Sequence, residues 1–270
     1  MKSPRSVLIA GAGDLGMRLA ALRAARGEDV VAVRRRDVPT VEGVRHLRAD
    51  LASGEGFARL PRRPDAMVFC AAPEQRDEAG YRTLYVDGLR RLLDVLDVPR
   101  LIFVSSTAVY AEDAGEWVDE DTPARATAFN GRVLLEAEHE LAGHAGGIAL
   151  RLSGLYGPGR EMLLRRAREG GAGSARWSNR IHVQDAAAAL SHLLDRPDPR
   201  PLYLGNDDEP ALEHAVLAWL RAREGLPPVP AAKGPESGRR VSNDRLRASG
   251  WVPVYPDFRR GYAGLTMPGL

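Results

Sequence analysis

The chain has 270 residues, of which 44% are hydrophobic and only 6% aromatic, so it can bury a substantial aliphatic core. The formal net charge of +2, with both signs interleaved, argues against a nucleic-acid-binding face, and no apolar run reaches the roughly 20 residues of a membrane span. The single cysteine, Cys70, excludes an internal disulfide and a cysteine-based zinc cluster, and it suits a reducing, cytoplasmic compartment.

The first half of the chain alternates apolar strands with helices. We predict strands at 6–10, 29–33, 44–49, 66–71, 101–105 and 147–152, and helices at 14–26, 77–96 and 126–145. Strands that are apolar throughout are buried on both faces, and their alternation with helices is typical of a parallel sheet. We therefore predict an α/β fold with a Rossmann-type doubly wound parallel sheet.

The pattern becomes irregular after about residue 153. A helix is expected at 183–194, a strand at 202–204, a helix at 211–223, and a mostly irregular, proline-rich tail from Gly225. We predict two parts. Residues 1–153 and 181–205 form a dinucleotide-binding domain, and residues 154–180 and 206–270 form a small C-terminal substrate-binding lobe.

The motif GAGDLG at residues 11–16 follows the first predicted strand and opens the first predicted helix, which is the context that gives G-x-G-x-x-G its meaning. Gly11 would allow the tight turn, Gly13 would let the backbone approach a diphosphate, and Gly16 would let helix and strand pack closely. The helix N-terminus adds free N–H groups and a partial positive charge. We assign the cofactor to Gly11, Gly13, Asp14, Leu15 and Gly16; the alternative is a glycine turn without a ligand.

Three arginines, Arg34, Arg35 and Arg36, follow the second predicted strand. A protein that binds NAD usually has an acidic residue here for the ribose hydroxyls, whereas arginine suits the 2′-phosphate of NADP. We therefore favour NADP over NAD, with contacts from Arg34 and Arg35. The run could also be solvated surface, and Asp37 could approach the ribose.

Further motifs occur in a fixed order along the chain: VSSTAVY (104–110), VDEDTP (118–123), RLSGLYGPGR (151–160), NRIHVQDAAAAL (179–190) and RRVSNDRLRASGW (239–251). With these motifs the chain resembles the extended short-chain dehydrogenase/reductase superfamily, in particular the NAD-dependent epimerase/dehydratase family. The last motif is similar to an atypical branch that keeps the nucleotide fold and lacks part of the active site.

The resemblance implies an oxidoreductase that acts on a nucleotide sugar or another hydroxyl- or carbonyl-bearing metabolite. It also implies a possible homodimer, paired through the helices at 77–96 and 126–145. Further cofactor contacts are expected from Asp50, Leu51, Ala71, Ala72 and Ser105. Asp50 could instead begin a turn.

The catalytic pair of that family is missing. The family uses a tyrosine for proton transfer and a lysine four residues later that lowers the tyrosine pKa. Aligning residues 130–138 with the family's Y-G-x-S-K-x-x-x-E places Asn130 at the tyrosine and Leu134 at the lysine, and a shift of two gives Ala128 and Arg132. The sequence contains only two lysines, Lys2 and Lys233, and neither lies near this helix.

Other side chains could carry part of this chemistry. Ser106 or Thr107 would hold a substrate oxygen, and Tyr110, Tyr156 or water would handle the proton; both tyrosines could equally pack against the cofactor or the core.

Arg160 and Arg180 could clamp a phosphate or carboxylate, or form surface salt bridges. His182 could be a general base or a structural tie, with Asp185 capping the next helix.

No metal site is expected, since His139 and His144 are five positions apart and do not share a helix face. Two functions remain open: an NADP-dependent oxidoreductase, or a non-catalytic protein that binds or senses NADP(H) with a degenerate active site.

Overall fold

A computed structural model describes residues 4–36, 41–170, 173–230 and 234–265. The chain divides into two compact units. Unit 1 contains Met1–Tyr110, Ala124–Arg151 and Ala187–Tyr203, and unit 2 contains Ala111–Pro123, Leu152–Ala186 and Leu204–Leu270. Lys2, Asp37 and Lys233 lie outside the described residues.

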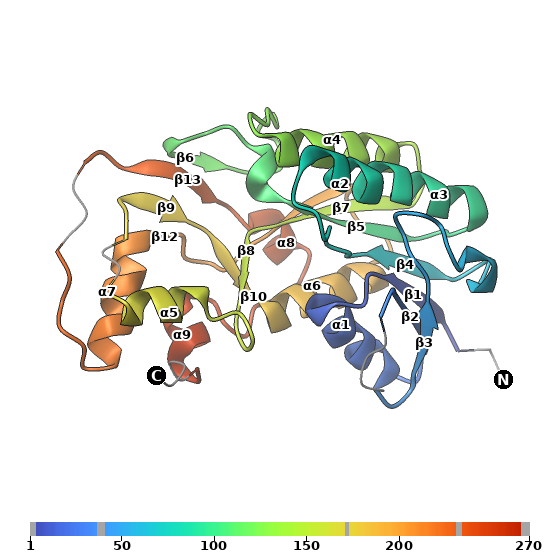
Figure 1. The fold of residues 1–270 in the computed structure, drawn as a ribbon, viewed down its shortest axis with the longest axis horizontal. Coiled ribbons are helices and arrows are strands. Elements are labelled where there is room, and N and C mark those ends of the chain that lie inside the picture. Colours follow the sequence, from blue (N-terminus) through green and yellow to red (C-terminus); the bar gives the residue numbers. More distant parts are fainter. Residues whose placement is uncertain (1–3, 37–40, 171–172, 231–233, 266–270) are drawn as a thin grey trace. The chain divides into compact units, whose positions relative to one another are not determined.

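Unit 1 is built on a seven-stranded sheet with the order β11-β7-β5-β4-β1-β2-β3 (Figure 1). Its strands are β1 (Ser6–Ala10), β2 (Asp29–Arg34), β3 (Val44–Arg48), β4 (Ala66–Phe69), β5 (Leu101–Ser106), β7 (Gly147–Leu152) and β11 (Leu202–Gly205). The pairs β1–β2, β1–β4, β2–β3 and β4–β5 are parallel. The predicted α/β fold with a doubly wound parallel sheet is confirmed.

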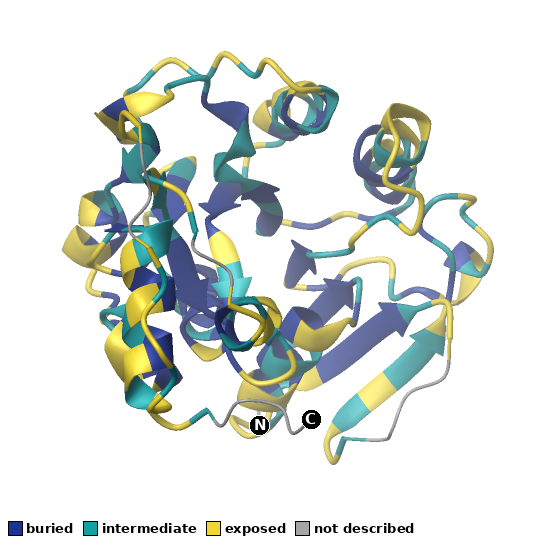
Figure 2. Cartoon of the chain, turned by 60° about the vertical axis from the view of Figure 1, so that its left-hand side comes forward, coloured by how far each residue is buried: buried dark blue, intermediate teal, exposed yellow. Residues whose placement is uncertain are grey.

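Helices cover both faces of this sheet, as the pattern of apolar strands requires. Helices α2 (Glu78–Arg82), α3 (Gly88–Val95) and α4 (Phe129–Ala142) lie on one face, and α1 (Asp14–Ala24) and α6 (Val183–Asp195) lie on the other (Figure 1). A π-helical turn, η2 (Thr83–Asp87), joins α2 to α3. The 3₁₀ turns are η1 (Phe57–Arg59) and η3 (Thr107–Val109). The central strands are buried almost without interruption (Figure 2).

Unit 2 contains a four-stranded sheet with the order β12-β9-β13-β6 and a two-stranded sheet of β8 and β10. These strands are β6 (Ala114–Val118), β8 (Gly154–Tyr156), β9 (Arg176–Ser178), β10 (Arg180–His182), β12 (Ala211–Leu212) and β13 (Ser237–Val241). The helices are α5 (Met162–Arg168), α7 (Glu213–Arg223), α8 (Asp244–Ala248) and α9 (Phe258–Ala263).

The described part of the tail from Gly225 is mostly irregular, as expected, but it also holds the short elements β13, α8 and α9. β13 is stabilised by pairing with β6 and β9, which lie far away in the sequence, so its five residues carry no periodic signal of their own. Among the residues described, no helix is both long enough and apolar enough to cross a membrane.

Candidate functional site

The glycine motif forms the turn between β1 and α1. Gly11 has a φ of 103°, and a Cβ there would lie 2.3 Å from the backbone nitrogen of Ala71. At Gly16 a Cβ would lie 2.4 Å from the carbonyl oxygen of Gly11, so helix and strand can pack this closely only without a side chain. Gly13 differs from both, because a Cβ there would meet nothing within 4 Å. Its exposed backbone at the N-cap of α1 therefore leaves room for a ligand.

The turn lies where the strand order reverses. β1 is flanked by β2 on one side and β4 on the other, and successive strands continue outward from each. In open α/β sheets a ligand binds outside the carboxyl ends of the strands at this switch point. Gly11 follows β1, and Ala71 and Ala72 follow β4, so both sequence segments predicted to contact a cofactor reach the same edge. Gly11 and Ala71 are in close contact there.

The three arginines after β2 have different surroundings. Arg35 and Arg36 both pair with Glu74, at 3.0 Å and 2.6 Å. Arg34 ends β2 and is half-buried, and within the described chain its guanidinium has no ion pair or side-chain hydrogen bond. Among the described residues, Arg34 is thus the one of these three arginines without an ion pair.

Asp50 is half-buried and Leu51 buried, in the loop after β3. The carboxylate of Asp50 accepts a hydrogen bond from the backbone N–H of Ala52 at 2.9 Å, which forms the turn that the sequence allowed as an alternative. Cys70 donates to the carbonyl oxygen of Gly11 at 3.2 Å, and burial raises the pKa of its thiol to about 12. The thiol is therefore part of the packing beneath the glycine turn.

A buried polar network lies at the end of β5. Ser105 donates to Glu138 Oε1 at 2.5 Å, and Glu138 pairs with Arg151 at 2.6 Å. Arg151 Nη1 donates to the hydroxyl oxygen of Tyr110 at 2.8 Å, and the guanidinium carbon lies 5.0 Å from the ring centroid. Tyr110 is 2% exposed, so its hydroxyl is part of the interior of unit 1. Sequence reasoning did not select Glu138 and Arg151.

The two hydroxyl residues that follow Ser105 begin the 3₁₀ turn η3. Ser106 Oγ accepts from the backbone N–H of Ala108 at 3.1 Å, so its own proton is available to a further acceptor. Ser106 and Thr107 are both half-buried. Gly131 on α4 packs against this turn, because a Cβ there would lie 2.5 Å from the carbonyl oxygen of Ala108.

Helix α4 carries no group that replaces the missing pair. Asn130 is half-buried and Leu134 is 4% exposed. Arg132 is exposed, donates to the carbonyl oxygen of Thr127 at 2.7 Å and lies 3.8 Å from Glu78. Arg132 thus makes its contacts at the protein surface, with the backbone just before its own helix and with Glu78.

The remaining predicted residues belong to unit 2. Tyr156 is 4% exposed, its hydroxyl lies 3.4 Å from the carbonyl oxygen of Asp257, and a Cβ on Gly261 would lie 1.9 Å from that hydroxyl. His182 is buried, with ring centroids 5.3 Å from Tyr156 and 3.9 Å from Tyr255. The two aromatic contacts and the close approach to Gly261 make Tyr156 and His182 parts of a packed interior.

Arg180 is buried and its guanidinium lies 5.4 Å from the ring centroid of Phe258, whereas Arg160 is half-buried. Asp185 accepts from the backbone N–H groups of Val254 and Tyr255, at 2.8 Å and 2.9 Å. It therefore holds the C-terminal segment, and the expectation that it caps its own helix was wrong.

Comparisons with known proteins agree with this geometry. The sequence model of the NAD dependent epimerase/dehydratase family matches residues 7–204. Protein YeeZ of Escherichia coli strain K12 is 33% identical over 220 residues, which span 74% of this chain and 76% of YeeZ.

Solved structures extend the similarity over nearly the whole chain. A Methylobacillus flagellatus protein, provisionally described as an NAD-dependent epimerase/dehydratase, is 38% identical with a TM-score of 0.85, and the match covers 97% of this chain and 98% of that one. MoeE5, solved in complex with UDP-glucose and NAD, is 25% identical with a TM-score of 0.80 and 96% coverage of each chain.

Proposed function

Because the chain belongs to the NAD dependent epimerase/dehydratase family, we propose that it binds NADP(H) and acts as an oxidoreductase on a hydroxyl- or carbonyl-bearing metabolite. The observation that carries this proposal is the open space at Gly13, where the N-cap of α1 meets the switch point of the sheet. A diphosphate at this position would accept hydrogen bonds from the first turn of α1 and gain from its partial positive charge. Gly11, Asp14, Leu15 and Gly16 complete this cradle.

NADP is favoured over NAD because of Arg34. It is half-buried at the end of β2, without an ion pair among the described residues, whereas Arg35 and Arg36 share Glu74 as an ion-pair partner. A 2′-phosphate would provide the missing partner for Arg34. The rest of the cofactor site would be lined by Asp50, Leu51, Ala71 and Ala72. Ser105, whose hydroxyl donates to Glu138, would also lie at this site.

A bound nicotinamide would supply the hydride chemistry, and the chain would position the substrate. Ser106 can donate its hydroxyl proton to a substrate oxygen, because its oxygen already accepts from Ala108, and Thr107 would assist. Tyr110 and Tyr156 are both buried, at 2% and 4% exposure, so we assign proton transfer to water and structural roles to the two tyrosines.

We propose a nucleotide sugar as the first substrate class to test, since the similar MoeE5 was solved with UDP-glucose. Residues 154–180 and 206–270 would form the substrate-binding lobe. Arg160 and Arg180 would face an anionic group, with His182 ordering the segment around them.

A homodimer through α2, α3 and α4 is also proposed. The surface that would pair is polar, since it carries the ion pairs Arg82–Glu136 and Arg90–Glu140 between its own helices.

The second candidate is a non-catalytic NADP(H)-binding or -sensing protein. It is favoured by Asn130 and Leu134 at the positions of the catalytic pair and by the burial of both candidate tyrosines. The test is oxidation of NADPH, followed by absorbance, with a panel of carbonyl compounds and UDP-sugars. Turnover with a member of the panel supports the oxidoreductase. Binding of NADPH without turnover across the panel supports the second candidate, and the absence of binding overturns both.

A further inference from the structure

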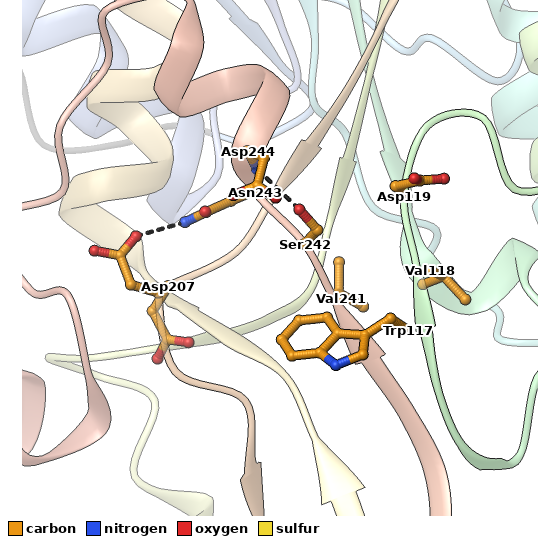
Figure 3. Close-up of a pocket in the computed structure, with 9 residues that line it drawn as sticks. Trp117, Val118, Asp119, Asp207, Val241, Ser242, Asn243 and Asp244 are labelled. Carbon is orange, nitrogen blue, oxygen red and sulfur yellow. Dashed lines mark hydrogen bonds between the residues drawn. The ribbon is translucent and has the colours of Figure 1, made fainter.

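Unit 2 contains a cavity of about 320 Å³ that lies apart from the glycine turn in sequence. Its walls come from β6, from the loop after β11 and from the segment that joins β13 to α8 (Figure 3). The residues that line it are Trp117, Val118, Asp119, Asp207, Asp208, Val241, Ser242, Asn243 and Asp244. None of the individual residues assigned above to the cofactor or the substrate lines this cavity, although part of its lining belongs to the segment 206–270 of the proposed substrate-binding lobe.

The cavity has a fixed aromatic wall. Trp117 is 55% exposed, which is unusual for a side chain of this size. Arg240 holds the indole in place, since its guanidinium lies 5.2 Å from the Trp117 ring and 5.0 Å from the Trp177 ring, and its Nε donates to the carbonyl oxygen of Gly115 at 2.7 Å. An exposed, immobilised indole presents an apolar surface at little entropic cost on binding.

The polar walls offer mostly hydrogen-bond acceptors. Four of the lining residues are aspartates, and no lysine or arginine is among them. Asn243 donates to Asp208 at 2.8 Å, and Ser242 Oγ accepts from the backbone N–H of Asp244 at 3.0 Å, which fixes this wall (Figure 3). The Ser242 hydroxyl remains a possible donor.

Asp207 lines the cavity but is closed to a ligand. It is 1% exposed, and its two carboxyl oxygens are buried and have no hydrogen-bond partner within the described residues. A buried carboxylate without a partner is costly, so burial favours the neutral form of Asp207.

The charge of the cavity restricts its ligand. The carboxylates of Asp119, Asp208 and Asp244 disfavour a phosphate or carboxylate, such as the diphosphate part of a nucleotide sugar, although Arg247 lies 3.7 Å from Asp208. The ligand must instead offer several hydroxyl donors and one apolar ring face for Trp117. We propose that this cavity binds an uncharged sugar ring, a site separate from the dinucleotide and its substrate. The axial C–H groups of a pyranose would pack on the indole while its hydroxyls donate to Asp119, Asp208 and Asp244.

The test is ligand-observed saturation-transfer NMR on the full chain, with the methyl pyranosides of glucose, galactose, mannose and N-acetylglucosamine. Methyl glucuronide and glucose 6-phosphate are the anionic counterparts. We expect at least one neutral glycoside to bind, and both anions to bind at least about tenfold more weakly. Failure of all four neutral probes, or equal binding of the anions, would overturn the proposal.

Two variants and one control locate the site. Trp117→Ala is expected to weaken binding at least about tenfold, and Asp244→Asn, at an exposed position, is expected to weaken it several-fold with little risk to folding. Met162→Ala, an exposed apolar side chain outside the cavity, is expected to leave binding unchanged. Binding that survives both cavity variants overturns the assignment. Gly13→Val should retain sugar binding, which separates this site from the dinucleotide site.

Discussion

Arg151 donates a hydrogen bond to the Tyr110 hydroxyl at 2.8 Å and pairs with Glu138 at 2.6 Å. These contacts connect β7, α4 and the end of β5, because Glu138 also accepts from Ser105. The positive charge beside the tyrosine thus comes from an arginine that is itself neutralised. The arrangement fixes the turn that carries Ser106 and Thr107, and it does not recreate a tyrosine activated by lysine.

Removal of one partner of this network should be strongly destabilising. In Glu138→Leu the buried Arg151 loses its counter-charge, and we expect the free energy of unfolding to fall by about 3–5 kcal/mol. Arg90→Met breaks the exposed pair Arg90–Glu140 and should cost below about 1 kcal/mol. Urea unfolding measures both. The double variant Glu138→Leu/Arg151→Met should be more stable than Glu138→Leu alone; equal costs at the buried and exposed pairs would contradict this account.

Gly13 and Gly16 of the turn should differ in how much stability they lose when replaced by alanine. A Cβ at Gly16 would lie 2.4 Å from the Gly11 carbonyl oxygen and 3.1 Å from Cys70 Sγ, so Gly16→Ala should cost about 1–3 kcal/mol. Gly13→Ala places its Cβ in open space, and we expect a change within about 0.5 kcal/mol. Thermal unfolding without cofactor distinguishes them. A stable Gly16→Ala protein would show that close helix–strand packing is not required.

The parallel sheet of unit 1 and its glycine turn could be predicted from sequence because their signals are local. The buried central strands are mainly apolar runs, unbroken in β4, and the GAGDLG motif joins a strand to a helix. The four-stranded sheet of unit 2 could not be predicted in this way. β6 and β13 pair although more than a hundred residues separate them in the sequence, and β13 has the polar sequence SGRRV.

The polar network was missed for a similar reason. Ser105 and Tyr110 were selected from a motif after β5, but their partners Glu138 and Arg151 lie in α4 and β7. In the sequence alone, nothing marks a glutamate in a helix and an arginine in a strand as partners, because only the fold brings them together. Glu138 stands at the family's glutamate position in the alignment that starts at Asn130, and this was the one signal available.

The preference for NADP should depend on Arg34. Arg34→Ala is expected to raise the Kd for NADPH at least about tenfold, the loss of one charge-assisted contact, while the Kd for NADH changes little. Arg36→Ala is the matched control, since Arg36 is exposed and pairs with Glu74. Fluorescence titration of both cofactors gives the comparison. Equal weakening of NADPH and NADH binding would show that Arg34 does not recognise the 2′-phosphate.

Asp207 should make the stability of the protein depend on pH. Burial raises the pKa of its carboxyl well above the ordinary value, although Arg180 lowers it. Above about pH 4 the unfolded chain loses this proton while the folded protein keeps it, so Asp207 costs stability as the pH rises towards its folded pKa.

Asp207→Asn removes this titration. Its free energy of unfolding, relative to the natural chain, should therefore increase with pH by up to about 1.4 kcal/mol per unit across the window. Urea unfolding at several pH values between 5 and 8 measures this difference. A relative stability that stays constant over this pH range would mean that Asp207 is already charged in the folded protein.

The central claim is that the turn at Gly13 holds a dinucleotide diphosphate, and calorimetric titration of NADPH and NADH into the natural chain and into Gly13→Val tests it most directly. We predict that the natural chain binds NADPH more tightly than NADH. Gly13→Val, whose side chain would occupy the open space, should fold normally and bind neither cofactor measurably. Equal NADPH binding by the two proteins, or no binding by the natural chain at millimolar cofactor, would contradict the claim.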